Sequence, residues 1–235
     1  MPATGSVEEK AAAASFKNAT RVQVSFVTAA EKRVLAWFAA RMPGWVNSDH
    51  LTALGFAAQI MVGVSYALAR YNRQWLLWGV LFLAVNWFGD SLDGTLARFR
   101  NRQRPRYGFY VDHVIDAIGS TALMVGLALS GYMSPIVAMG LLVAFLLLAI
   151  ETYLATYTVG KFHLSFFNLG PTEIRIILAI GNVALYVRGP WSHIAGRRFL
   201  LFDVGAVVAM IGMGTMFLYA AIKHTVQLYR EERLS

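Results

Sequence analysis

Long stretches without a charged side chain are the feature that most limits how this chain can fold. Residues 51–69, 74–89, 117–150 and 204–222 contain no Asp, Glu, Lys or Arg. A membrane span needs about 20 mostly apolar residues, so the longest stretch could supply most of two spans. Only 14% of all residues are charged, whereas ordinary soluble domains have about 25%. The chain is therefore predicted to be an integral membrane protein.

Turn-forming and helix-starting residues divide these stretches into six predicted spans. Residues 131–135 (Gly-Tyr-Met-Ser-Pro) are typical of a turn inside the longest stretch. Pro171 suits the first turn of another helix. These signals predict an all-α integral membrane protein with six transmembrane helices. The spans are expected near residues 51–70, 74–98, 110–131, 135–159, 171–188 and 200–223.

The N-terminal region differs in composition from the predicted spans. Residues 1–27 are polar and Ala-rich, lack the short apolar core of a signal peptide, and are expected to be poorly ordered. Residues 28–42 combine basic side chains with a Trp-Phe pair. This pattern predicts an amphipathic interfacial helix, although a solvated leader helix would share it. The expected divisions are a leader with this helix over 1–45, a six-helix membrane domain over 46–225 and a cytoplasmic tail over 226–235.

The net charge of +8 is informative about topology. If the N-terminus lies inside, most Lys and Arg residues fall on the side of both termini, including five arginines between Arg98 and Arg106. The positive-inside rule then places both termini and this arginine-rich connection in the cytoplasm. Because the basic residues flank the predicted spans, we expect them to contact anionic lipid headgroups, and we do not expect them to bind nucleic acid.

Four aspartates stand at the ends of two neighbouring predicted spans, where a charge is costly and usually functional. Asp90 and Asp93 fall on one helix face, and Asp112 and Asp116 form a stripe with i, i+4 spacing on the next helix. A short connection makes consecutive helices antiparallel neighbours. The two acidic faces are therefore predicted to meet at the cytoplasmic end.

Carboxylates that face one another repel unless a cation lies between them. Ligands that are all oxygen suit Mg²⁺, Mn²⁺ or Ca²⁺, and Mg²⁺ commonly binds carboxylates together with substrate phosphates. The chain has no cysteine, which excludes a thiolate metal site. The aspartates therefore predict a divalent-cation site.

The residues that share the acidic faces are small or basic. Gly94, Ala97 and Gly108 leave room for a ligand to approach the backbone, and Arg98 can bind a phosphate through two N–H groups. Taken one by one, an aspartate near a helix end is more often a cap, and small residues can serve helix packing. Together these residues indicate metal-assisted transfer at a diphosphate, with two metal ions.

The full pattern is Asp-x2-Asp-Gly-x2-Ala-Arg-x9-Gly-x3-Asp-x3-Asp, with eight fixed positions in 27 residues. It resembles the signature of the CDP-alcohol phosphotransferases, and the resemblance covers about residues 45–225. It implies a six-helix enzyme of phospholipid biosynthesis. Such an enzyme transfers a substituted phosphate group from a CDP-linked donor to an alcohol acceptor and releases CMP, with Mg²⁺ or Mn²⁺ as its ions.

The resemblance also implies roles for individual residues. Asp90, Asp93 and Asp112 would bind metal, and Asp116 would be the general base as well as a contact of a second ion. The family often has Asn or Asp followed by Thr before the first span, lining the nucleotide site. The residues expected to contact the CDP moiety are Gly94, Ala97, Arg98, Gly108, Asp49 and Thr52.

Further residues have two possible roles each. Glu173 and Arg175, at the start of the fifth predicted span, could bind the acceptor or be an ordinary helix-end pair. Glu151 lies deep in the fourth predicted span, where a charged side chain needs a partner. A structural role with such a partner and a contact with substrate are both open.

Two short features resemble the choline and ethanolamine branch of the family: His113 directly after Asp112, and the Gly-Pro-x-Glu run over residues 170–173. The position of His113 off the aspartate stripe favours a packing role.

Several alternatives stay open at this point. The donor could be CDP-diacylglycerol or a CDP-aminoalcohol, and the acceptor alcohol is not identified. A transporter or cation channel with an acidic intramembrane site is the contrasting class, but repeat symmetry and broken helices are not detected. An inactive family member is a third possibility, which the complete set of aspartates disfavours. A homodimer and a location in a bacterial inner membrane, with the active site on the cytoplasmic side, are also expected.

Overall fold

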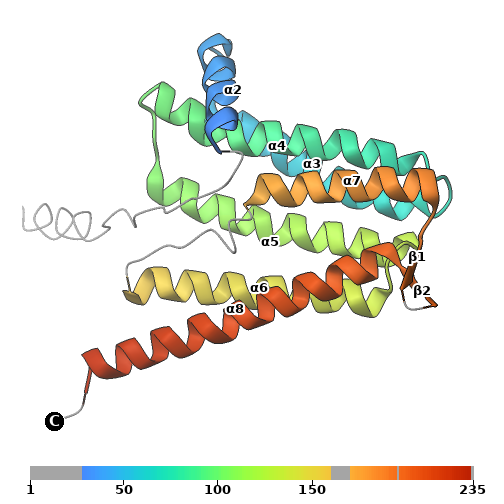
Figure 1. Cartoon of the computed structure of the whole chain (residues 1–235). Helices are drawn as coiled ribbons and strands as arrows, with labels where there is room; N and C mark the ends of the chain where they lie inside the picture. Colours follow the sequence, from blue (N-terminus) through green and yellow to red (C-terminus); the bar gives the residue numbers. More distant parts are fainter. Residues whose placement is uncertain (1–27, 160–169, 195, 234–235) are drawn as a thin grey trace, which may run out of the picture.

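The computed structural model describes residues 28–159, 170–194 and 196–233. Over these residues it consists of helices and one short hairpin (Figure 1). The expectation for residues 1–27 lies outside the described residues. The elements are α2 (Thr28–Arg41), α3 (Ser48–Ala69), α4 (Trp75–Phe99), α5 (Pro105–Ser130), α6 (Pro135–Val159), α7 (Pro171–Arg188), β1 (Trp191–Ile194), β2 (Arg197–Leu200) and α8 (Leu201–Glu231).

Five of these helices are long and apolar enough to cross a membrane, namely α3, α4, α5, α6 and α8. The predicted all-helical integral membrane fold is thereby confirmed. The fifth predicted span forms α7 at the expected residues, but α7 is not among these five helices. It has 18 residues, and Glu173, Arg175 and Arg188 are charged. By length and composition the described residues therefore give five candidate spans, and the exact number of spans stays a prediction.

The predicted turn between the third and fourth spans is confirmed. Gly131 follows α5 with a φ of 77°, a left-handed conformation that glycine adopts without steric cost. The backbone N–H and the hydroxyl of Ser134 donate to the Asp203 carboxylate at 2.7 and 2.5 Å. The start of α6 is therefore held by the first turn of α8.

The hairpin between α7 and α8 was not predicted. Strands β1 and β2 pair antiparallel, with Trp191 opposite Leu200, and Gly196 between them has a φ of 77°. Strands of four residues are too short to show a clear alternation of polar and apolar side chains. Figure 1 places the hairpin at one end of the bundle, with α2, the α4–α5 connection and the last turns of α8 at the other.

Helix α3 packs against both α4 and α5, and glycines permit the closest approach. A Cβ added at Gly63 would collide with the Ala122 carbonyl group, and one added at Gly126 would collide with the Gly63 carbonyl group. Small residues bring helix backbones together in this way in membranes. The α3–α5 pair, which carries two of the site aspartates, therefore depends on Gly63 and Gly126.

Replacing Gly126 with alanine is expected to lower the thermal stability of the protein in detergent. Overpacking a tight contact costs about 1–3 kcal/mol, and here backbone atoms would have to move. Gly214→Ala is the matched control, because nothing lies within 4 Å of a Cβ added there. The measurement is the melting temperature of both variants. Equal melting temperatures would contradict the close approach of α3 and α5.

Helix α2 is attached to the bundle by an apolar cluster and by an arginine. Leu35 and Ala39, with 5% and 1% of their surfaces exposed, pack with buried Leu92 and Leu96 of α4. The Arg100 guanidinium donates to the carbonyl oxygens of residues 42, 43 and 46, just after α2. A helix was predicted at these residues, and its position on the membrane surface stays a prediction.

Candidate active site

Three aspartates from two helices come together at the end of the bundle where α2 lies. Asp90 of α4 and Asp112 and Asp116 of α5 each offer a carboxylate oxygen, and these oxygens all lie within 4.8 Å of one another. All three residues are partly buried. The acidic stripes of α4 and α5 therefore do approach each other, as their helical spacing predicts.

Asp93, the fourth predicted metal ligand, is not part of this group among the described residues. Its carboxylate accepts hydrogen bonds from the Thr52 hydroxyl, at 2.6 Å, and from the Gly94 backbone N–H. The Ser48 hydroxyl donates to the Asp93 carbonyl oxygen at 3.0 Å. Thr52, predicted to contact the nucleotide, thus lies beside a predicted metal ligand and holds its side chain.

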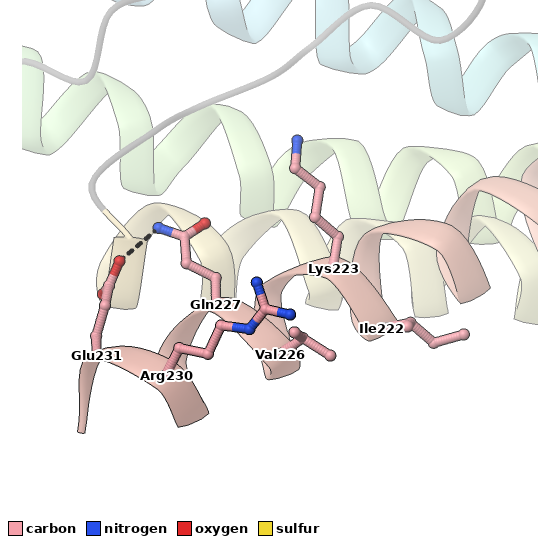
Figure 2. A pocket seen from close by; sticks show the side chains of 6 residues that line it. All are labelled: Ile222, Lys223, Val226, Gln227, Arg230 and Glu231. Carbon is pink, nitrogen blue, oxygen red and sulfur yellow. Dashed lines mark hydrogen bonds between the residues drawn. The ribbon is translucent and has the colours of Figure 1, made fainter. Parts of the chain in front are cut away.

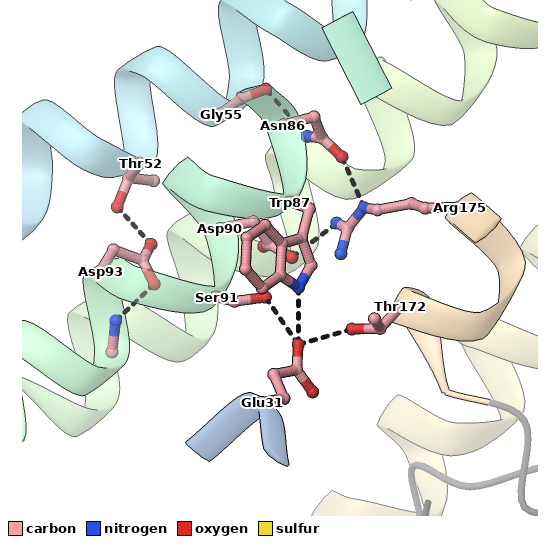
Figure 3. Close-up of polar contacts among 11 residues, drawn as sticks. Glu31, Thr52, Gly55, Asn86, Trp87, Asp90, Ser91, Asp93, Thr172 and Arg175 are labelled. Carbon is pink, nitrogen blue, oxygen red and sulfur yellow. Dashed lines mark hydrogen bonds and ion pairs between the residues drawn. The ribbon is translucent and has the colours of Figure 1, made fainter. Parts of the chain in front are cut away.

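Arg175 reaches the aspartates from α7 (Figure 3). Its Nη2 atom donates to Asp90 Oδ2 at 2.6 Å, and its Nε atom donates to Asn86 Oδ1 at 2.7 Å. Asn86 is 4% exposed and in turn donates to the Gly55 carbonyl oxygen at 2.9 Å. A buried amide anchored on α3 therefore fixes where the guanidinium lies. The pair brings a positive charge to the edge of the acidic group.

Glu173 has a different position from Arg175. Its carboxylate accepts from the Gly170 backbone N–H at 2.9 Å and completes the first turn of α7. This contact is the helix-end role that the sequence left open, because such a carboxylate satisfies an N–H group that has no partner within the helix. Contact with an acceptor stays a prediction for both Glu173 and Arg175.

A cavity of about 370 Å³ lies between the start of α3 and the end of α4. Asp49 and Ala97, both predicted to contact the CDP moiety, line it together with Arg100, Arg102 and Arg104. Asp49 forms an ion pair with Arg104. The volume is within the range of about 300–1,000 Å³ that is usual for small-molecule sites. Arginines around such a cavity suit an anionic ligand.

The remaining predicted nucleotide contacts lie one or two helical turns from the clustered aspartates along α4 and α5. The Arg98 Nη2 atom donates to the Thr95 hydroxyl at 3.2 Å, and the Arg98 guanidinium lies closest to the space beside Gly94. No atom lies within 4 Å of a Cβ added at Gly108. Space and a cation are thus both present where the sequence predicts the diphosphate.

A larger hollow, of about 560 Å³, lies against the last turns of α8 (Figure 2). Figure 2 shows its side chains along one helix, with Gln227 donating to Glu231 at 2.9 Å. Its lining includes Lys223 and Arg230 but none of the four aspartates. The 370 Å³ cavity is not lined by these aspartates either, but its lining residue Ser48 donates a hydrogen bond to the Asp93 carbonyl oxygen, which connects that cavity to the site.

Two polar residues close to the aspartates were not predicted. Asn86 stands one helical turn before Asp90 in an uncharged stretch, and this spacing was the signal that could have revealed it. Glu31 of α2 accepts hydrogen bonds from Trp87 and Thr172, both at 2.7 Å. Local sequence carries no sign of such distant partners.

Glu151 and His113 have the partners that their positions require. The Glu151 carboxylate lies 2.7 Å from His224 Nδ1, which links α6 to α8. His113 Nδ1 lies 2.5 Å from the Phe109 carbonyl oxygen, and the His113 ring packs 4.6 Å from the Tyr153 ring. His113 is therefore a packing residue beside Asp112, as predicted from its position.

The three clustered aspartates fit a divalent cation. Mg²⁺ binds oxygen ligands at about 2.1 Å, so opposite ligands lie about 4.2 Å apart, and Ca²⁺ accepts longer distances. Oxygens within 4.8 Å of one another need only small side-chain shifts to share one ion. The donors are all carboxylate oxygens, which suits Mg²⁺ and Mn²⁺.

The fold and site define a helical membrane protein that has an acidic oxygen site and an arginine-lined cavity at the same end of its bundle. The CDP-alcohol phosphatidyltransferase family model matches residues 45–226, and the chain belongs to this family.

Relatives are found in both bacteria and archaea. A phosphatidylinositol phosphate synthase of Streptomyces avermitilis is 35% identical over 98 residues, which is 41% of this chain and 38% of that protein. An archaetidylinositol phosphate synthase of Pyrococcus horikoshii is 30% identical over 86 residues, covering 37% and 43% of the two chains. Another from Methanothermobacter thermautotrophicus is 26% identical over 149 residues, covering 61% and 70%. The chain thus spans less than half the length of the first two relatives.

Proposed function

We propose that this protein transfers the phosphatidyl group of CDP-diacylglycerol to a hydroxyl of a phosphorylated polyol, with inositol phosphate as the leading candidate, and releases CMP. The observation that carries the proposal is the meeting of Asp90, Asp112 and Asp116 at the end of the bundle that also holds an arginine-lined cavity. The relatives described above make phosphatidylinositol phosphate or archaetidylinositol phosphate. Arg175, the cation at the edge of the aspartates, suits the phosphate of such an acceptor.

Each group of residues has a part in the reaction. Asp90, Asp112 and Asp116, with Asp93 for a second ion, would hold Mg²⁺ or Mn²⁺, which when bound neutralises the diphosphate and the charge on departing CMP. Arg98 and the cavity residues orient the CDP moiety. Asp116 accepts the proton of the acceptor hydroxyl. The hydroxyl oxygen then attacks the lipid-bearing phosphorus, the bond from this phosphorus to the CMP oxygen breaks, and CMP leaves.

A CDP-aminoalcohol donor has less support. Two features of the sequence favoured it, His113 and the Gly-Pro-x-Glu run that ends at Glu173. In the structure His113 packs against aromatic rings, while Pro171 and Glu173 belong to the first turn of α7. Both features therefore have roles in packing and helix initiation that are independent of the donor.

The orientation in the membrane is part of the same proposal. Basic residues of the α4–α5 connection flank the end of the bundle that holds the aspartates, and the positive-inside rule places such an end in the cytoplasm. We therefore propose a cytoplasmic active site, in a bacterial inner membrane. The homodimer expected from the family resemblance stays a prediction.

A screen of substrate pairs tests the proposed reaction. The purified protein in lipid, with Mg²⁺ or Mn²⁺, is given CDP-diacylglycerol or a CDP-aminoalcohol together with inositol phosphate, glycerol phosphate, free inositol or diacylglycerol. We expect CMP release with CDP-diacylglycerol and inositol phosphate, and little with free inositol because Arg175 then has no phosphate to bind. Turnover only with a CDP-aminoalcohol would contradict the donor. Cation flux in liposomes without any CMP release would favour the transporter class.

A further inference from the structure

Glu31 joins three helices next to the aspartates. One oxygen of its carboxylate, Oε1, accepts from Trp87 Nε1 and from the Thr172 hydroxyl at 2.7 Å each, and from the Ser91 hydroxyl at 3.4 Å (Figure 3). Trp87 and Ser91 belong to α4, Thr172 belongs to α7, and Glu31 itself belongs to α2. The N-terminal helix thus ties together two helices that lie far apart in the sequence.

The donors that bind Glu31 are close in sequence to residues of the site. Ser91 directly follows Asp90, and Thr172 stands one helical turn before Arg175. The ion pair between Asp90 and Arg175 therefore spans the same two helices that Glu31 connects. A change in the spacing of α4 and α7 would move the guanidinium relative to the carboxylate.

We infer that Glu31 is a positioning residue, through which α2 sets the spacing of α7 and α4 and so aims Arg175 at the aspartates. The role assigned to Arg175 rests on the proposed function, but the spacing itself does not. The residue lies outside the stretch 45–226 that the family model matches, so the family alone does not account for it. Because its donors among the described residues, Trp87, Ser91 and Thr172, are all neutral, the position requires an acceptor oxygen and does not require a negative charge.

This requirement separates two substitutions at one position. Glu31→Gln keeps an acceptor oxygen at the same distance along the side chain, whereas Glu31→Ala leaves the donors of Trp87 and Thr172 without it. Both variants are expected to fold with α2 attached, since buried Leu35 and Ala39 hold the helix independently. Glu231→Ala, at the exposed end of α8, is the matched control for loss of a glutamate.

The first test is the effect on each substrate. Small displacements of a positioned group cost up to about 100-fold in rate, so Glu31→Ala is expected to lower kcat by about 10- to 100-fold and to raise the KM of the acceptor. The KM of the CDP-linked donor should stay the same, because the cavity is lined by the start of α3, the end of α4 and the α4–α5 connection, with no residue of α7. Glu31→Gln and Glu231→Ala should match the wild type.

The second test does not depend on the reaction. The chain has no cysteine, so Leu81→Cys on α4 and Ile177→Cys on α7, with 49% and 56% of their surfaces exposed, can carry a spin label each. We expect the distance distribution between the labels to broaden or shift with Glu31→Ala and to be unchanged with Glu31→Gln. Identical distributions in all backgrounds would overturn the inference even if the enzyme is active. A shifted distribution without any turnover would sustain it while contradicting the proposed function.

Discussion

Replacing Asp116 with asparagine should remove nearly all CMP release. An asparagine side chain cannot take up the proton of the substrate hydroxyl as a carboxylate does. Loss of a general base costs about 10²–10⁴-fold in rate. The side chain is also one of three whose oxygens lie within 4.8 Å, so the change removes a charge from the cation site. The measurement is CMP release at saturating substrate and metal, with the melting temperature recorded for each variant.

Asp203→Asn is the matched control for this substitution. Asp203 is a carboxylate of the same size, at the hairpin end of the bundle, where it accepts hydrogen bonds from Ser134. The control should turn over at the wild-type rate and differ only in thermal stability. If Asp116→Asn is folded and retains wild-type activity, Asp116 is not the base.

Removing divalent cations should abolish activity, and adding back Mg²⁺ or Mn²⁺ should restore it. Without a cation, three carboxylates face one another, and the Arg175 guanidinium pairs with one of them, Asp90. A ligand that binds only the folded state at about 100 times its Kd stabilises that state by about 2.7 kcal/mol. The metal should therefore also raise the melting temperature.

The variants Asp90→Asn and Asp112→Asn connect the metal effect to the aspartates. Each removes one charged oxygen ligand, so each should shift the activation curve to higher metal concentration. A monovalent salt at matched ionic strength is the control for screening. Full activity after exhaustive chelation, or activation curves that the variants leave unchanged, would contradict a cation at these residues.

The parts of the fold that depend on local patterns could be predicted. The uncharged stretches predicted the positions of the helices, and the turn at Gly131 predicted the boundary between α5 and α6. The i, i+4 spacing of Asp112 and Asp116 predicted an acidic face of α5 that is turned toward α4. Helix α7 forms at the residues predicted for a span, but it is short and carries charges at both ends, so its length and composition do not identify it as a span. The length of each uncharged stretch and the positions of its charges, both visible in the sequence, were therefore enough to predict where the helices lie.

The contacts that shape the site could not be predicted because they join distant segments. Thr172 and Glu31 are 141 positions apart, and Asn86 and Arg175 are 89 apart. Patterns within one helix show which side chains share a face, but they do not show which helix packs on that face. The hydrogen bond from the Thr52 hydroxyl to the Asp93 carboxylate likewise joins two different helices, α3 and α4.

A crystal structure with Mn²⁺ and CDP-diacylglycerol would test the central claim most directly, since the anomalous signal of manganese locates the ion independently of the protein. We predict an anomalous peak between the carboxylates of Asp90, Asp112 and Asp116, with the CDP diphosphate beside it and the cytidine toward the cavity lined by Asp49 and Ala97. A bound donor whose diphosphate lies away from these aspartates, with no manganese among them, would contradict the account.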